Sequence, residues 1–370
     1  MPRVGVIFGG RSGEHEVSLA SAASIIAALE QRGHDVVPIG IGRDGRWVVG
    51  GDPMRALAEQ ARVALPSGDD TGSVKKALAD RAESVRATAS AALARTEPAG
   101  SVPAELRQGL DVVFIALHGP YGEDGTIQGL LEVADVPYVG AGVLASAVGM
   151  DKATMKTIFR AHGLPIVEHT VVLRRDWRAK RDEVLRSVLD SVGVPCFVKP
   201  CNLGSSVGIS KATSVAEVAT ALDEAARHDR KIIVERAIAR VREIEVSVLG
   251  NDDPRTSLPG EIVYESEWYD YATKYAEGQA RLVCPAPVSP GLTARFRELA
   301  VTAFRAVDCA GMARVDFFLG GTSILVNEIN TIPGFTSTSG YAKMWEATGL
   351  AYPDLVQRLV DLALERHRDK

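Results

Sequence analysis

The sequence contains few cysteines, and their spacing argues against two common uses of this residue. Only four occur among 370 residues: Cys196, Cys201, Cys284 and Cys309. They form no C-x-x-C pair and no other metal-binding pattern, and the chain is too long for a small domain held together by disulfides. We therefore expect reduced thiols packed in or near the core.

Long apolar runs and a surplus of basic charge are missing as well. The longest apolar run, residues 112–117, covers about six residues, whereas a membrane-spanning helix needs roughly 20. The 42 basic and 47 acidic residues give a net charge of −5, which does not suit the neutralisation of a nucleic-acid backbone. Residues 1–10 hold too short an apolar stretch for a signal peptide. We expect a cytoplasmic protein that binds neither nucleic acid nor a membrane.

Aromatic residues are scarce, at 6% of the chain, and none lies between Trp47 and Phe114. Small and polar residues dominate this stretch, which predicts a peripheral insertion near residues 52–108. Glycine is abundant instead: 35 of 370 residues is about 9.5%, against an average near 7%. A glycine surplus indicates loops in which bare backbone approaches a ligand.

Strand-like and helix-like segments alternate from the start of the chain. Residues 4–8, 36–41 and 111–117 have the apolar, β-branched character of strands, and residues 19–29 have helical apolar spacing. This alternation predicts a parallel sheet covered by helices. At about 150 residues per domain, the chain has room for two or three domains.

The remainder of the chain predicts two units that mix helices with short strands. The expected helices are residues 145–162, 182–192, 215–227, 292–307 and 353–366. The expected strands are residues 166–173, 196–199, 207–210, 231–235, 243–249, 313–319 and 324–330.

The last two of these strands bear a cluster of polar residues. Glu328 and Asn330 are two apart and share one face of their strand, as do Arg314 and Asp316 on the preceding strand. Converging Asp, Glu and Asn oxygens suit Mg²⁺, an ion that also holds nucleotide phosphates. A solvated sheet face is the alternative, but core-type residues surround the four polar positions.

The turn between these strands decides whether the four side chains meet. A three-residue turn of Gly320, Gly321 and Thr322 would place Leu319 opposite Ser323 and all four polar side chains on one face. A two-residue turn without a bulge would split them between the two faces. The sequence leaves both turns open.

Two loops after predicted strands are candidate ligand sites. Lys199 ends a strand and precedes residues 202–208, where glycine, serine and backbone N–H groups could surround phosphate oxygens; an ordinary hairpin is the alternative. The stretch 118–129 follows strand 111–117, at the sheet edge where ligands bind in α/β folds. His118 with Glu123 and Asp124 could also suggest a transition-metal site, but no second histidine stands at ligand spacing.

These stretches carry a resemblance to a known family. His118-Gly119-Pro120-Tyr121-Gly122-Glu123-Asp124-Gly125 resembles the H-G-x-x-G-E-D-G segment of the D-alanine:D-alanine ligases, members of the ATP-grasp superfamily. The family's other landmarks match in the family's order at residues 9–18, 150–152, 199 with 204–208, 271–275, 314–316 and 328–334. The matches span nearly the whole chain except the insertion.

The resemblance implies an α/β fold, with α+β central and C-terminal parts, in a three-domain ATP-grasp architecture. Its expected domains are an N-terminal domain with a Rossmann-like parallel sheet at residues 1–143, a central subdomain at 144–238 and a C-terminal subdomain at 239–370. An ω-loop lid is expected near residues 264–278. A homodimer is the family's oligomeric state.

The resemblance also implies a reaction. ATP would phosphorylate the carboxylate of one D-alanine, and the amine of a second D-alanine would attack the D-alanyl phosphate. The products would be D-alanyl-D-alanine, a peptidoglycan precursor, with ADP and phosphate.

The implied residue roles divide between nucleotide and substrate. Two Mg²⁺ or Mn²⁺ ions would be held by Asp316, Glu328 and Asn330, with Glu328 shared. The implied ATP-binding residues are Lys152, Lys199, Ser205, Ser206, Glu235, Ala237, Ile238, Glu243 and Lys274. Within this set Glu235, Ala237 and Ile238 would lie near the adenine, and Glu243 would reach the ribose.

On the substrate side, Glu16 would bind the ammonium of the first D-alanine and His118 would help place its carboxylate. Arg314 and the N–H of Gly334 would stabilise the developing oxyanion. The residues expected at the second D-alanine and in the lid are Ser339, Gly340, Lys274 and Tyr275, with Tyr275 directed toward Ser205 and Glu16. Position alone would also allow a helix-dipole contact for Glu16, and a turn or helix cap for Ser339.

Three alternatives stay open. A D-alanine:D-lactate ligase or another ATP-grasp carboxylate-amine ligase would share most of these residues, although Tyr275 favours D-alanine as the second substrate. A nucleotide-binding regulator on the same fold would not need Arg314. A Rossmann oxidoreductase would need G-x-G-x-x-G spacing, which is absent after the first strand.

Overall fold

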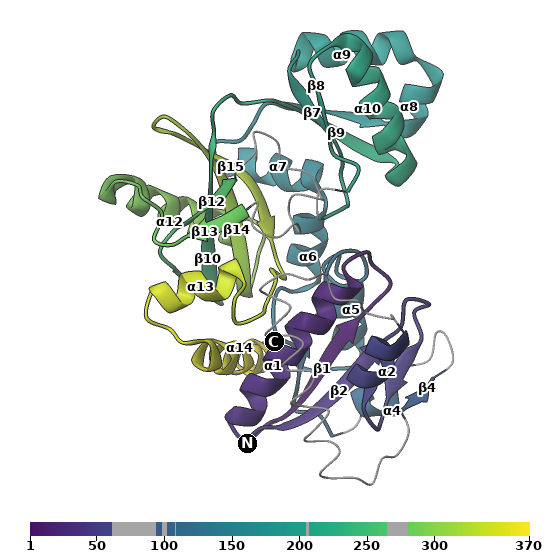
Figure 1. The fold of residues 1–370 in the computed structure, drawn as a ribbon, viewed down its shortest axis with the longest axis vertical. Coiled ribbons are helices and arrows are strands. Elements are labelled where there is room, and N and C mark those ends of the chain that lie inside the picture. The colour runs from purple at the N-terminus through teal and green to yellow at the C-terminus, as the bar shows by residue number, and fades with distance from the viewer. Residues whose placement is uncertain (61–93, 98–101, 108, 205–206, 265–279) are drawn as a thin grey trace.

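The structure is a computed structural model of the chain, and it describes residues 1–60, 94–97, 102–107, 109–204, 207–264 and 280–370. Three sheets follow one another along the longest axis in Figure 1, each with its own helices. Most of the expected insertion and all but residue 264 of the expected lid lie outside the described residues. Within the described part, no helix is both long and apolar enough to span a membrane.

The N-terminal sheet has the strand order β4-β3-β2-β1-β5. The central strand β1 (Arg3–Gly9) pairs in parallel with β2 (Asp35–Ile41) and with β5 (Val112–Ile115), which confirms the predicted parallel arrangement. The strands β3 (Trp47–Val49) and β4 (Arg95–Thr96) extend the sheet in antiparallel fashion, which the sequence analysis did not predict.

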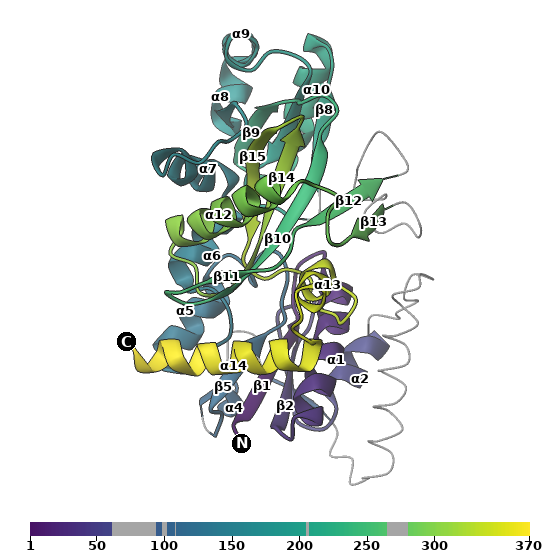
Figure 2. The same ribbon diagram turned by 90° about the vertical axis from the view of Figure 1, so that its left-hand side faces the viewer.

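Helices cover this sheet because its central strand is an apolar run buried on both faces. The helix predicted at residues 19–29 is α1 (His15–Gln31), and the other helices of the unit are α2 (Pro53–Gln60), α4 (Ala104–Arg107) and α5 (Thr126–Val133). The C-terminal helix α14 (Tyr352–Arg368) also packs here, beside α1 and β5, as Figure 2 shows. The first and last parts of the chain therefore share one hydrophobic core.

The second sheet is a separate antiparallel unit with its own core. Its order is β6 (His169–Leu173), β9 (Lys231–Arg236), β7 (Cys196–Pro200) and β8 (Ser210–Ala212). Its helices are α8 (Arg174–Ala179), α9 (Arg181–Ser191) and α10 (Val215–His228). The strand expected at residues 207–210 begins only at Ser210, and α8 was not predicted.

The third sheet lies between the other two in Figure 1. Its path is β13 (Ala280–Val283), β12 (Gly260–Tyr264), β10 (Arg242–Gly250), β14 (Gly311–Gly320) and β15 (Ser323–Asn330), with β11 (Arg255–Thr256) paired to β10. Helix α12 (Pro290–Ala306) covers its apolar face, and α13 (Gly340–Ala347) packs on β10.

The single helix predicted over residues 145–162 is wrong, because the structure has two helices there. They are α6 (Val143–Met150) and α7 (Lys152–Ala161), separated at Asp151, whose backbone is extended (φ −89°, ψ 96°). The Asp151 carboxylate accepts a hydrogen bond from the Thr154 N–H at 2.9 Å and so caps α7. The break makes Lys152 the first residue of a new helix.

Between β14 and β15 the structure has the shorter of the two turns considered. Gly320 pairs with Ser323, which leaves a two-residue turn, and Leu319 lies opposite Ile324 instead of Ser323. Gly321 within this turn has φ +62°, a left-handed conformation that tight hairpin turns require and that glycine adopts without strain.

Candidate functional site

The polar residues of the β14–β15 hairpin nevertheless lie on one face. Asp316 stands opposite Glu328 and Arg314 opposite Asn330, because a β-bulge shifts the register between Asp316 and Phe317. The extra residue is Asn327 in β15, which has no partner in the ladder. The bulge has the effect that a three-residue turn would have had, so the four side chains share one face although the turn is the shorter one.

Arg314 is bound to two carboxylates in this face. Its Nε and one terminal nitrogen each lie 2.7 Å from an oxygen of Asp316, and Nε lies 3.3 Å from Oε1 of Glu245. Burial alone would lower the pKa of Arg314, but the Asp316 and Glu245 carboxylates raise it well above its ordinary value. The guanidinium is therefore a permanent cation beside the candidate metal ligands.

Glu245 is a site residue that the sequence analysis missed. It lies on β10 directly opposite Asp316, two residues after Glu243 and so on the same face. That two-residue spacing within a predicted strand was the signal that could have found it. The Oε2 atom of Glu243 accepts a hydrogen bond from the Tyr264 hydroxyl at 2.7 Å, and burial raises the pKa of Glu243.

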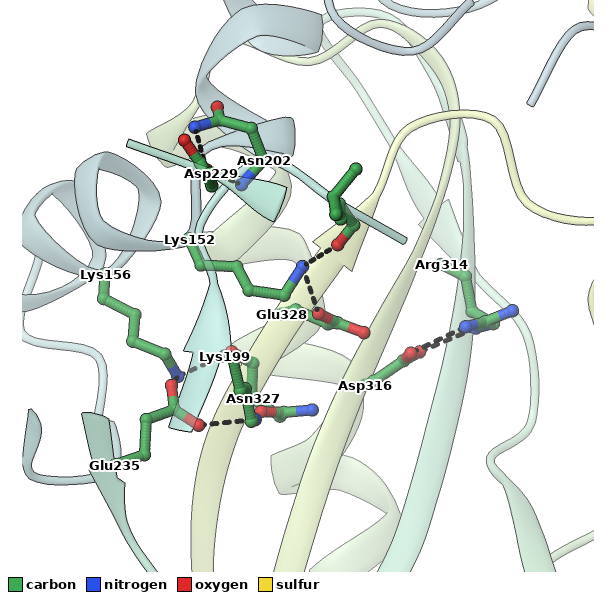
Figure 3. Close-up of polar contacts among 11 residues, drawn as sticks. Lys152, Lys156, Lys199, Asn202, Asp229, Glu235, Arg314, Asp316, Asn327 and Glu328 are labelled. Atoms are coloured by element: carbon green, nitrogen blue, oxygen red, sulfur yellow. Dashed lines mark hydrogen bonds and ion pairs between the residues drawn. The ribbon is translucent and has the colours of Figure 1, made fainter. Parts of the chain in front are cut away.

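Three lysines approach this face from the second unit and from α7 (Figure 3). The Nζ of Lys152 donates to the Leu203 carbonyl at 2.8 Å and lies 3.5 Å from Oε2 of Glu328. The Nζ of Lys199 donates to Oε2 of Glu235 at 2.6 Å. Lys156, which the sequence analysis did not single out, lies 3.0 Å from Oε1 of Glu235.

Glu235 lies at the centre of this group of lysines. It is 2% exposed, and its two oxygens face two different ammonium groups. Burial alone would raise the pKa of Glu235, but Lys156 and Lys199 together hold it well below its ordinary value. The same pairing raises the pKa of Lys199, although burial opposes it. Ala237 and Ile238, the other expected adenine neighbours, follow directly after β9.

His118 joins the end of the N-terminal sheet to the segment after β15. It is 4% exposed, its Nδ1 lies 3.1 Å from the Ile332 carbonyl, and its Nε2 lies 3.0 Å from the Ser21 hydroxyl. Burial lowers the pKa of His118, which favours the neutral ring. Because a carbonyl can only accept, Nδ1 donates to Ile332 and Nε2 accepts from Ser21.

Glu123, in the same loop as His118, was not among the predicted site residues. Its Oε2 accepts a hydrogen bond from the Gly119 N–H at 2.7 Å. Desolvation by the surrounding protein, together with the nearby Glu14 carboxylate, raises the pKa of Glu123 to about 8. The carboxyl is therefore protonated in the folded protein near neutral pH.

The remaining predicted substrate residues occupy the ends of two helices. Glu16 lies in the first turn of α1 and pairs with Arg43. Ser339 precedes α13 but does not cap it; its hydroxyl accepts from the Thr336 N–H at 2.9 Å and closes the turn that follows Gly334. Of the two alternatives for Ser339, the turn is therefore right and the helix cap is wrong. Gly340 begins α13, close to the Glu245 carboxylate.

Four predicted site residues lie outside the described residues: Ser205, Ser206, Lys274 and Tyr275. Their roles stay predictions from the family resemblance.

The hairpin face offers oxygen ligands of the kind that Mg²⁺ and Mn²⁺ prefer. Asp316 and Glu328 supply two carboxylates on neighbouring strands, and Asn330 supplies an amide oxygen. In the described part of the chain, no group of three or more His, Cys, Asp or Glu residues is placed to hold a metal ion. The donor set therefore fits a hard cation shared with phosphate oxygens rather than an all-protein metal cage.

In a comparison with known proteins, two models of one protein family together match nearly the whole chain. Family models described as D-ala D-ala ligase N-terminus and D-ala D-ala ligase C-terminus match residues 3–141 and 158–361. A D-alanine–D-alanine ligase from Heliobacterium modesticaldum is 51% identical over 369 residues, covering 99% of this chain and 96% of that protein. One from Paenarthrobacter aurescens is 48% identical, with coverage of 99% and 96%.

Two solved structures have a similar fold. The D-alanine–D-alanine ligase from Coxiella burnetii has a TM-score of 0.79 at 37% identity, covering 100% of this chain and 95% of that one. The VanG D-Ala:D-Ser ligase from Enterococcus faecalis has a TM-score of 0.77 at 31% identity, with coverage of 98% and 99%. The predicted α/β fold of the ATP-grasp type is thereby confirmed.

The raised pKa of Glu123 predicts a pH-dependent stability. The folded protein binds one more proton than the unfolded chain between the ordinary pKa of 4.5 and about 8. The free energy of unfolding should therefore fall as pH rises through this window, by less than about 1.4 kcal/mol per pH unit. Glu123→Gln should remove this slope, as measured by urea unfolding at several pH values. Asp124→Asn is the neighbouring control, and parallel curves for wild type and Glu123→Gln would contradict the prediction.

Proposed function

The chain belongs to the D-alanine–D-alanine ligase family, and on that basis we propose that it joins two D-alanine molecules to D-alanyl-D-alanine for peptidoglycan synthesis, with consumption of ATP. The observation that supports this most directly is the hairpin face, where two carboxylates and an amide stand beside a partly buried arginine and three lysines. Such a face suits phosphoryl transfer, which depends on positioning and charge neutralisation.

The proposed reaction has two steps. A carboxylate resists attack by an amine because it is negatively charged, so one oxygen of the first D-alanine carboxylate takes the γ-phosphoryl group of ATP and ADP leaves. The amine of the second D-alanine then attacks the acyl carbon, the C–O bond to phosphate breaks, and the nitrogen loses a proton. Arg314 and the N–H of Gly334 stabilise the oxyanion between these events.

ATP and two Mg²⁺ or Mn²⁺ ions are the proposed cofactors. Asp316, Glu328 and Asn330 would hold the ions, with Glu328 as the shared ligand. When bound, these ions neutralise phosphate oxygens and thereby favour transfer. Lys152 and Lys199 already lie at this face, and their Nζ atoms are placed to exchange carboxylate partners for phosphate oxygens.

The nucleotide base and ribose would lie between the second and third sheets. Glu235, Ala237 and Ile238 would border the adenine, and Glu243 would reach the ribose. Oε1 of Glu235 is a buried acceptor without a hydrogen bond inside the described residues, although it lies 3.0 Å from the Lys156 ammonium. A buried acceptor of this kind supports a polar contact with the base.

The amino-acid substrates would lie between the hairpin and the N-terminal loops. Glu16 would bind the first ammonium. His118 would help place the first carboxylate by fixing the loop around it, since both ring nitrogens are bound within the protein to Ile332 and Ser21. Ser339 and Gly340 would receive the carboxylate of the second D-alanine. Ser205, Ser206, Lys274 and Tyr275 complete the proposed site by family resemblance.

Three further features belong to the proposal. The domains would be residues 1–143, 144–238 and 239–370, consistent with three sheets, and the protein would act in the cytoplasm. The chain would form a homodimer, as the family resemblance implies. Sedimentation velocity would measure the oligomeric state.

The decisive activity test is phosphate release from ATP and Mg²⁺. We expect release to depend on D-alanine, because the first step transfers the γ-phosphoryl group of ATP to the D-alanine carboxylate. A folded protein that releases no phosphate on addition of D-alanine would refute the ligase proposal.

The second substrate needs its own test, since one similar structure is a D-Ala:D-Ser ligase. Tyr275 supports D-alanine. Reactions with D-alanine plus D-serine or D-lactate, analysed by mass spectrometry near neutral pH, should yield mainly D-alanyl-D-alanine. A predominance of the depsipeptide or of D-alanyl-D-serine would overturn this specificity.

Metal dependence tests the role of Glu328. We expect Glu328→Gln to raise the Mg²⁺ concentration for half-maximal activity more than about tenfold, because losing even a partner of a metal ligand costs roughly 10–100-fold. Glu298→Gln, which alters an exposed carboxylate of α12, is the matched control. An unchanged Mg²⁺ requirement in Glu328→Gln would remove Glu328 from the metal site.

A further inference from the structure

Lys156 is a buried cation that is not among the proposed substrate-binding or ATP-binding residues. It lies one turn after Lys152 on α7, and its side chain is 1% exposed. Its Nζ donates to the Asn327 carbonyl at 2.8 Å and lies 3.0 Å from Oε1 of Glu235 (Figure 3). Burying an ammonium group is costly unless it is paired and hydrogen-bonded, so both contacts bear on its role.

The first contact fixes the bulge in β15. Asn327 is the residue without a ladder partner, and its carbonyl is bound by Lys156. Side chains alternate along a strand, so removal of the bulge would place Asp316 opposite Asn327 and turn Glu328 to the other face. The ammonium of Lys156 therefore stabilises the bulge that places Asp316 and Glu328 on one face.

The second contact fixes a phosphate-facing lysine. Glu235 binds Lys156 through Oε1 and Lys199 through Oε2. With Lys156 absent, the buried carboxylate would keep a single cation and could shift toward the space that Lys156 leaves. Lys199 would then lose its fixed position.

We propose that Lys156 is a positioning residue, which sets the register of the metal-binding strand and the direction of Lys199 through Asn327 and Glu235. It joins the third sheet, through β15, to the second sheet, through β9. The inference rests on the proposed function in one respect, namely that Glu328 and Asn330 bind a divalent cation with ATP.

The test is Mn²⁺ binding in the presence of ATP, followed by electron paramagnetic resonance, on the full-length chain. Lys156→Met should weaken Mn²⁺ binding about 10–100-fold, the effect typical of lost partners of metal ligands. It should also raise the KM for ATP more than the KM for D-alanine. Lys156→Gln keeps an N–H donor without the charge and should give a smaller loss in the same direction.

Arg366→Met is the matched control for stability. Arg366 also donates to backbone carbonyls, those of Tyr138 and Gly140, but far along the chain from the hairpin. We expect it to lower the thermal unfolding temperature without weakening Mn²⁺ binding. A merely structural role for Lys156 would make its variants behave like Arg366→Met, and that result would overturn the proposal.

The experiment distinguishes a loss of folding from a loss of metal binding. If Lys156→Met does not fold, the Gln variant decides alone: Mn²⁺ binding equal to wild type refutes the positioning role. If the wild-type protein binds Mn²⁺ with ATP but releases no phosphate with D-alanine, the ligase proposal fails. The Mn²⁺ affinities of the Lys156 variants would still test the positioning role.

Discussion

One extra residue in β15 decides which side chains share the polar face of the hairpin. The turn between β14 and β15 is tight, and an uninterrupted ladder after it would place Glu328 on the opposite face from Asp316. The bulge at Asn327 reverses this arrangement over the last residues of the strand. Bulges carry an unpaired carbonyl, and the buried Lys156 satisfies the one at Asn327. The local irregularity, the buried lysine and the acidic face are therefore one structural feature.

Three carboxylates in and beside the hairpin face are each paired with a cation. Asp316 pairs with Arg314, Glu328 with Lys152 and Glu235 with Lys199. Burial raises the pKa of Glu123, whereas Lys156 and Lys199 hold the pKa of the buried Glu235 below its ordinary value. Pairing with cations therefore decides which of these two buried carboxyls is ionised.

The sequence was informative where chemistry depends on local pattern. The strand–loop succession around His118 and the two-residue spacing of Asp316 with Arg314 led to residues that the fold brings to the same region. The register of the hairpin could not be predicted, because Gly320, Gly321 and Thr322 allow turns of different length. In addition, no residue pattern in the sequence marks the position of the bulge. Lys156 resembled an ordinary helical lysine, since only the packing of α7 against two sheets buries it. The helix break at Asp151 did have a local signal, an aspartate three residues before the N–H of Thr154.

The site residues come from units with separate hydrophobic cores. Helix α14 packs on the N-terminal sheet, and His118 binds the Ile332 carbonyl, so the substrate-facing loops are built onto the end of β15. The second sheet has a separate core and supplies Lys199 and Glu235. Polar contacts from Lys152 and Lys156 join this sheet to the hairpin. Because an ammonium can exchange partners without disturbing apolar packing, the lysines proposed to face the nucleotide can exchange carboxylate for phosphate while the loops proposed to face the substrate keep their geometry.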